Sequence, residues 1–203
     1  MEINFIQIGA HVGPSETDLL SKLLEEVRFD WKGIFIEPHP ESFGKLKENY
    51  KDKKGYIFEN IAISDKDGIA KLYYSKSKGD INSYANASLI PDSWKKRNTD
   101  VIDVPIKTLK SIGEKYNLVG KEFDLLILDT EGYDDKIIMS TNFSEICPKR
   151  IIFEKVFMLT ETQVIVKKHL ESFGYTQIEY PYKYKLGTSN GFGRQDDYVF
   201  DKL

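Results

Sequence analysis

The chain of 203 residues, 40% hydrophobic and 30% charged, is long enough for one globular domain that buries roughly 70% of the surface its unfolded chain exposes. Its 29 lysines and arginines against 32 aspartates and glutamates give a net charge of −3, which argues against a nucleic-acid partner because phosphates attract a basic surface. The single cysteine, Cys147, excludes an intramolecular disulfide and a cysteine-based metal cluster. The sequence contains neither an apolar run of membrane-spanning length nor a secretory signal. We therefore expect a cytoplasmic protein without a membrane partner.

Short apolar runs alternate with helical patterns along the first half of the chain. Residues 3–8 are mostly apolar and end at Gly9, which predicts a buried strand. Ser15 then begins a helix, with Asp18 at the capping-box position. Four further elements are predicted in this half: a strand at 33–37, a helix around 43–50, a strand at 56–63 and a strand at 69–74.

In the second half, residues 75–100 are polar and irregular, whereas 125–128 and 151–153 are apolar runs typical of central parallel strands. The other predicted elements are an extended segment at 101–106, a short helix capped by Thr108, a helix at 160–173 ended by Gly174, and late strands at 175–180 and 198–200. This alternation predicts an α/β fold in a single domain, residues 1–203, with a mostly parallel sheet and helices on both faces.

Glycines and an acid follow the first two predicted strands, at the edge of a parallel sheet where ligands bind. Gly9 permits a sharp turn, Gly13 lets the following helix pack closely, and Glu37 can accept two hydrogen bonds from a ribose diol. These features fit either a nicotinamide dinucleotide or S-adenosylmethionine. His11 and Pro14 interrupt the glycine pattern that seats a pyrophosphate, which disfavours the dinucleotide.

Two acids, Asp129 and Glu131, come directly after the apolar run at 125–128. Packing gives no reason to end a buried strand in paired acids, because burial of unpaired charge is costly. We therefore interpret these acids as functional. The alternative is that Asp134 or Asp135 caps the next helix and that Asp129 is only solvated.

Four ordered segments carry a resemblance to a known family: IQIGAHVG, FIEPHPESFGKLKENY, NIAISDKDGIAKLY and LLILDTEGYDDKII. In order and spacing they resemble the FkbM-type methyltransferases over residues 3–155. The resemblance implies a seven-stranded, Rossmann-like class I fold and S-adenosylmethionine as the methyl donor. It also implies O-methylation, which in many members acts on sugar or polyketide hydroxyls.

The same resemblance implies where the donor binds. It places Gly9, Ala10 and Gly13 beside the methionine part, Glu37 with the adjoining Pro38 at the ribose, Asn60, Ile61 and Ala62 at the adenine edge, and Asp129 and Glu131 by the transferred methyl group. Some positions in the donor-binding loops differ from the family pattern. Gln7 stands where the family usually has an acid, and His11 and His39 stand where asparagine is common.

A base should take the proton of an acceptor hydroxyl during transfer, because an alcohol is a poor nucleophile at neutral pH. Asp129 and Glu131 are the leading candidates, and His11 and His39 are alternatives that hydrogen bonding within the cofactor loops also explains. Glu154 could join Asp129 around a divalent cation. We favour a structural carboxylate there and expect no metal.

The acceptor is expected to contact residues 75–105, a predicted recognition insertion. The predicted acceptor-binding residues are Ser88, Trp94, Glu154 and Tyr182. Aromatic faces beside short polar groups suit carbohydrates, which favours a sugar or glycan hydroxyl. Alternatives are a polyketide or other small-molecule hydroxyl, and a non-catalytic module that binds S-adenosylmethionine. The alternating Tyr180, Tyr182 and Tyr184 also fit an ordinary edge strand. The chain could be a module of a larger polypeptide or form a homo-oligomer.

Overall fold

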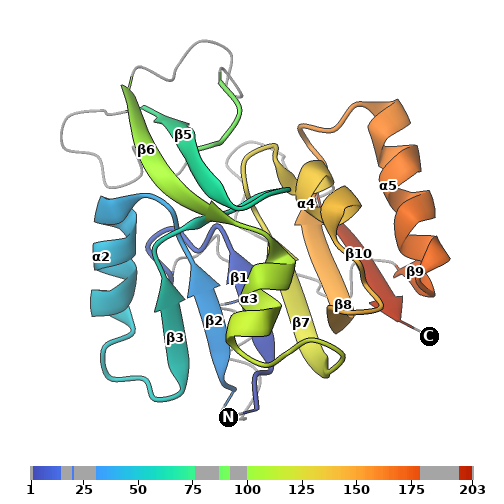
Figure 1. Cartoon of the computed structure of the whole chain (residues 1–203), viewed down its shortest axis with the longest axis horizontal. Coiled ribbons are helices and arrows are strands. Elements are labelled where there is room, and N and C mark those ends of the chain that lie inside the picture. The colour runs from blue at the N-terminus through green and yellow to red at the C-terminus, as the bar shows by residue number, and fades with distance from the viewer. Residues whose placement is uncertain are drawn as a thin grey trace, which may run out of the picture.

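A seven-stranded sheet forms the centre of the computed structural model, which describes residues 2–14, 20, 31–75, 87–91, 100–178 and 197–202. The strand order is β3-β2-β1-β7-β8-β10-β9 (Figure 1). The strands are β1 (Phe5–Ile8), β2 (Gly33–Ile36), β3 (Tyr56–Glu59), β7 (Glu122–Leu128), β8 (Cys147–Glu154), β9 (Tyr175–Ile178) and β10 (Asp197–Lys202). All neighbouring pairs are parallel except those of β10, which runs antiparallel to β8 and β9. The predicted mostly parallel α/β sheet is confirmed.

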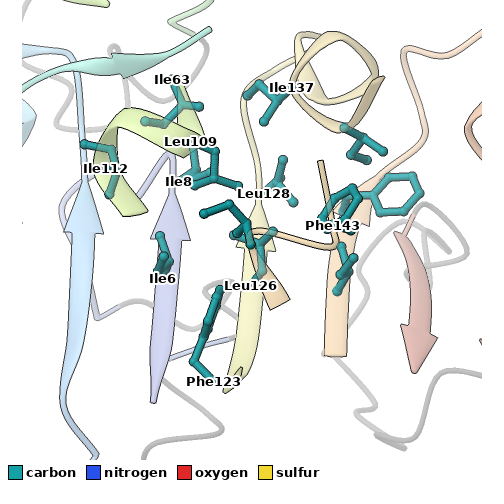
Figure 2. Close-up of a cluster of buried hydrophobic side chains, with 14 of the residues drawn as sticks. Ile6, Ile8, Ile63, Leu109, Ile112, Phe123, Leu126, Leu128, Ile137 and Phe143 are labelled. Carbon is teal, nitrogen blue, oxygen red and sulfur yellow. The ribbon is translucent and has the colours of Figure 1, made fainter. Parts of the chain in front are cut away.

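Helices cover both faces of this sheet, as predicted. On one face lie α3 (Leu109–Lys115), α4 (Asp134–Ser140) and α5 (Thr160–Ser172), and on the other lies α2 (Pro40–Asn49). Side chains alternate between the faces along each strand. In β1, Ile6 and Ile8 therefore join the cluster under α3 and α4, whereas Phe5 packs in the cluster that contains Leu46 of α2. Figure 2 shows Leu109 of α3 beside Ile8 in the first of these clusters.

A second, three-stranded sheet lies beyond the carboxyl ends of the main strands (Figure 1). Its order is β4-β6-β5, made of β4 (Ala62–Ile63), β6 (Asp100–Lys107) and β5 (Gly68–Tyr74). Leu72, Val104 and Ile106 form its buried cluster with Ala62. Extended chain was predicted in β5 and β6, but a separate sheet was not. Part of the predicted recognition insertion, residues 100–105, lies in β6.

The prediction of one strand at residues 56–63 is wrong. The chain there forms β3 in the main sheet and β4 in the small sheet, with Asn60 and Ile61 between them. The side-chain amide of Asn60 donates to the main-chain carbonyls of Glu37 and Pro38, at 2.8 and 3.0 Å. These bonds hold the chain at the end of β2 and separate the two strands.

The other predicted elements that fall within the described residues are present, although β7 and β8 are longer than the predicted apolar runs and α4 was foreseen only as the helix that Asp134 or Asp135 would cap. Thr108 caps α3, and its hydroxyl oxygen accepts a hydrogen bond from the Ser111 N–H at 3.0 Å. The helix α5 ends at Ser172, two residues before Gly174. The helix predicted after Ser15 lies outside the described residues. Within the described ranges, no helix is long and apolar enough to cross a membrane.

Candidate functional site

An open pocket lies at the carboxyl edge of the main sheet, where loops after β1, β2 and β7 meet residues of the small sheet. It contains about 510 Å³ of empty space, its open mouth included. The lining residues are Ile8, Gly9, His11, Ile36, Glu37, Pro38, Ile61, Ala62, Ile63, Leu72, Ala87, Leu89, Asp129, Thr130, Glu131 and Tyr133. The pocket therefore occupies the edge where a parallel sheet is expected to bind its ligand.

The loop after β1 approaches the end of β7 so closely that only glycine fits at its first position. Gly9 has a φ of +80°, and a Cβ there would lie 1.9 Å from the main-chain oxygen of Asp129. The N–H groups of Gly9 and Ala10 both donate to the Ile36 carbonyl, at 2.9 and 3.0 Å. The main chains of three strand ends are thus fixed against one another at the pocket floor.

Glu37 links the loops after β1 and β2. Its Oε2 accepts from the His11 N–H and its Oε1 from the His39 N–H, each at 2.8 Å. Glu37 is 4% exposed, and burial raises the pKa of its carboxyl group to about 7, while the two N–H donors act in the opposite direction and the charge of Asp129 raises it further. Each carboxylate oxygen has two lone pairs, so both oxygens can accept one more hydrogen bond from a ligand.

The segment that follows β7, the DTEG turn (residues 129–132), carries both predicted catalytic acids. Asp129 is exposed and Glu131 is partly buried, and both line the pocket. Glu131 has a φ of +55° and Gly132 of +103°. A non-glycine residue in the left-handed region persists only where its surroundings hold it there. The turn therefore depends on contacts from neighbouring residues.

Asp134 and Thr130 provide one such contact inside the turn. The Thr130 hydroxyl donates to Asp134 Oδ2 at 2.7 Å and accepts from the Tyr133 N–H at 3.1 Å. Asp134 is the first residue of α4 and is 1% exposed. Burial raises the pKa of the Asp134 carboxyl to about 7, and its bond from Thr130 opposes this rise. The buried carboxyl thus joins the start of α4 to the turn.

Glu154, at the end of β8, adds a further carboxyl beside the turn. Burial raises its pKa to about 9, and the charges of Asp129, Glu131 and Asp134 contribute to the rise. Glu154 therefore keeps its proton at neutral pH and is poorly suited to act as a base there. Within the described ranges, no group of three or more His, Cys, Asp or Glu side chains is arranged to hold a metal ion.

His11 and His39 lie in the loops after β1 and β2, where their main chains contact Glu37. His11 has a φ of +47°, and burial lowers its pKa, as do the charges of Lys45 and His39. His39 is 3% exposed and packs edge-on against Tyr74, with ring centroids 4.6 Å apart. Each histidine supplies a main-chain N–H to Glu37, and a role for either as base stays a prediction.

Residues 7–177 match the family model for the methyltransferase FkbM domain. This interval contains the pocket loops, Glu37 and the DTEG turn. The chain belongs to the FkbM methyltransferase family. No curated protein matches it significantly.

One solved structure shares the fold of this chain at low identity. The methyltransferase FkbM from Methylobacillus flagellatus KT has a TM-score of 0.56 and 10% identity, over 98% of this chain and 43% of that one. This chain therefore spans less than half the length of that relative. Two further structures match with lower TM-scores. A methyltransferase from Pyrococcus furiosus has a TM-score of 0.44 and 13% identity, over 99% of this chain and 75% of that one. Aeropyrum pernix fibrillarin with natively bound S-adenosyl-L-methionine has a TM-score of 0.45 and 10% identity, over 99% of this chain and 66% of that one.

Many of the predicted site residues of this FkbM-family chain meet in the pocket. Those in its lining are Gly9, His11, Glu37, Pro38, Ile61, Ala62, Asp129 and Glu131. Those outside its lining are Gln7, Ala10, Gly13, Asn60, Ser88 and Glu154. Of the second group, Gln7 is 3% exposed within β1, and Asn60 supports Glu37 and Pro38 through their carbonyls. Trp94 and Tyr182 lie outside the described residues.

Several residues that line the pocket were not predicted from the sequence. They are Ile63, Leu72, Ala87, Leu89, Thr130 and Tyr133, together with the strand ends Ile8 and Ile36. Tyr133 could have been found, since it directly follows the glycine of the DTEG turn. Leu72 and Leu89 carried no such signal, because apolar residues in a small sheet look like ordinary core.

Proposed function

We propose that this chain is an S-adenosylmethionine-dependent O-methyltransferase that acts on a hydroxyl group of a sugar or glycan. One observation carries the proposal: a buried carboxyl with acceptor capacity to spare, Glu37, shares a pocket with the acidic DTEG turn. A carboxylate at the end of β2 is suited to a ribose diol. The acids of the DTEG turn would attract a cationic donor, and one of them could accept the proton that the hydroxyl loses.

The residues of the pocket fit S-adenosylmethionine better than a dinucleotide. Its described lining includes Glu37, Asp129 and Glu131 but no lysine or arginine. A pyrophosphate carries negative charge and would be repelled by these acids, whereas a sulfonium is positive and would be attracted. Ile61, Ala62 and Pro38 offer an apolar surface for a purine.

When bound, the donor supplies an electrophilic methyl group, and the chain supplies position and a base. Glu37, Gly9 and the loop at 9–13 would hold the donor. Asp129 and Glu131 reach the pocket from the DTEG turn, where either carboxylate can accept the hydroxyl proton as the new C–O bond forms. Alignment of the acceptor oxygen behind the methyl group makes the main contribution to an in-line displacement.

A sugar acceptor is supported by the family resemblance and by sequence chemistry. Tyr180, Tyr182 and Tyr184 alternate in the sequence, and Trp94 occurs in a polar segment with Asn82 and Asn86. Aromatic faces bind the C–H surfaces of sugars, and short polar side chains bind their hydroxyls. These residues lie outside the described ranges.

Two measurements test the proposed function. Calorimetric titration of the protein with S-adenosylmethionine and, separately, with NAD should give binding for the first ligand only. Incubation with S-adenosylmethionine and a panel of sugars, glycosides, polyketides and catechols should give, by mass spectrometry, a gain of one CH₂ group on the carbohydrates. Methylation of polyketides or catechols alone would show that the acceptor is another hydroxyl compound and not a sugar. Donor binding without transfer to any acceptor would favour a non-catalytic binding module.

A further inference from the structure

We propose that Ser88 is a positioning residue, which fixes Glu131 of the DTEG turn in the conformation that turnover requires. The proposal rests on the proposed function, because it assigns Ser88 a part in methyl transfer through Glu131. It replaces the direct acceptor contact that the sequence suggested for Ser88.

The Ser88 hydroxyl bonds to two main-chain groups. It donates to the Glu131 carbonyl at 2.9 Å and accepts from the Ile90 N–H at 3.1 Å. Ser88 is 1% exposed. A serine hydroxyl has a single proton to donate, and here that proton points to the carbonyl of the left-handed residue. Ser88 therefore has no donor left for an acceptor molecule while this bond is made.

Ser88 is itself held by the small sheet. Its main chain exchanges two hydrogen bonds with Tyr73 of β5, each 2.9 Å long, in an antiparallel bridge. The hydroxyl bond to Glu131 thus links a residue bridged to β5 of the small sheet with the DTEG turn after β7 of the main sheet. A carbonyl fixed from outside the turn explains how Glu131 keeps its φ of +55°.

Neighbours of Ser88 strengthen the link between pocket wall and turn. Ala87 and Leu89, on either side of it, line the pocket. A Cβ built on Gly132 would lie 3.7 Å from Ile90 and 3.3 Å from Phe157, so the turn is enclosed from two sides. A ligand that contacts Ala87 or Leu89 therefore touches the same short segment that holds Glu131.

Ser88→Ala removes the hydroxyl, and Ser88→Cys keeps a similar volume but replaces a strong donor by a weak one. Both variants should lose about 10–100-fold in kcat, the scale of a small misplacement of a reacting group, while donor affinity changes little. The matched control is Ser140→Ala. The Ser140 hydroxyl also donates to a backbone carbonyl, that of Ile137 at 3.0 Å, but away from the turn, so kcat should stay at the wild-type value.

A double-mutant cycle separates positioning from general stability. In a Glu131→Gln background, Ser88→Ala should cost much less than in the wild type, because the residue it positions no longer acts. Equal losses in both backgrounds, or an unchanged kcat in Ser88→Ala, would overturn the proposal.

Hydrogen exchange gives a readout that does not require activity. Amides of residues 129–133 should exchange faster in Ser88→Ala than in wild type or Ser140→Ala. If the wild-type protein methylates nothing, the proposed function fails, and the exchange rates alone decide whether Ser88 holds the turn. Unchanged exchange of these amides would show that it does not.

Discussion

At the scale of single residues, one carboxyl, that of Glu37, organises the loops of the candidate site. Its two oxygens accept the N–H groups of His11 and His39, which lie in different loops. Asn60 fixes the carbonyl of Glu37 from a third segment. The carboxyl is therefore oriented by the main chain, and a diol would meet acceptors whose positions are already set.

Replacement of Glu37 by alanine tests this role. Glu37→Ala should weaken binding of S-adenosylmethionine by roughly 1.5–3 kcal/mol, the range for hydrogen bonds to a charged group. Calorimetry measures the change. Glu59→Ala is the matched control, because Glu59 ends the neighbouring strand β3 but bonds to Lys115 and Tyr116 outside the pocket lining. Equal donor affinity in wild type and Glu37→Ala would contradict the assignment to the ribose.

The acids of the DTEG turn have a different expected signature. If one of them is the base, Asp129→Asn or Glu131→Gln should bind the donor normally and lose about 10²–10⁴-fold in turnover. Asp135→Asn is the control, since Asp135 lies in the first turn of α4, three residues beyond the DTEG turn, and pairs with Lys136. Normal turnover in both turn variants would mean that the base is elsewhere or is not needed.

Sequence reasoning assigned Glu37, Asp129 and Glu131 to the functional site because an acid is unusual at the end of a buried strand. All three are acids directly after apolar runs, and all three line the pocket. Ser88 is different, because a buried serine bonded to a distant carbonyl leaves no local pattern. The partner of such a hydroxyl depends on how two sheets meet, which spacing along the chain does not encode.

At the scale of elements, the join between the β1 loop and α2 depends on a glycine. Gly13 has a φ of +84°, and a Cβ there would lie 2.6 Å from the Tyr50 ring and 2.9 Å from Leu46. Asn49 also donates to the Val12 carbonyl at 2.8 Å. The loop that carries Gly9 and His11 is thus seated on the end of α2.

Two glycine-to-alanine changes should therefore shift stability in opposite directions. Gly13→Ala should lower the free energy of unfolding by more than about 1 kcal/mol, because the backbone is left-handed and the site is filled. Gly44→Ala should raise it by about 0.5–1 kcal/mol, because Gly44 is exposed within α2 and a Cβ there meets nothing within 4 Å. Denaturant unfolding measures both. Changes of the same sign would contradict this account of the join.

Strand periodicity predicted the type of these elements better than their pairing. The apolar runs of β1, β2 and β7 were recognised because buried parallel strands are apolar on both faces. The run at 56–63 is interrupted by Glu59 and Asn60, and it divides between two sheets at Asn60. At the division, the Asn60 side-chain amide bonds to carbonyls 22 and 23 residues away, and the hydrophobic pattern does not predict these partners.

At the scale of the whole molecule, the fold gathers buried acids at one edge of the main sheet. Burial raises the pKa of Glu37 and Asp134 to about 7 and of Glu154 to about 9. The charge of Asp129 contributes in each case. Since unpaired buried charge is costly, this arrangement opposes stability and makes sense at a site that receives a cationic ligand.

The sign of the resulting pH dependence follows from proton linkage. These carboxyls lose their protons near pH 4 in the unfolded chain but near pH 7 to 9 in the folded one. In between, the folded state binds more protons than the unfolded state, so stability falls as the pH rises. His11, whose pKa is lowered mainly by burial, acts in the opposite direction near pH 6.5, but it is one group against three.

We therefore expect the ligand-free protein to melt at a lower temperature at pH 9 than at pH 5. Because 1 kcal/mol corresponds to about 2–4 °C in a domain of this size, the fall should be about 5 °C or more. Calorimetric scans in buffers of equal ionic strength measure it. Asp134→Asn should make the profile flatter, because it removes one of the three buried carboxyls. A melting temperature that is constant or rises from pH 5 to pH 9 would show that the buried acids do not titrate as their surroundings require.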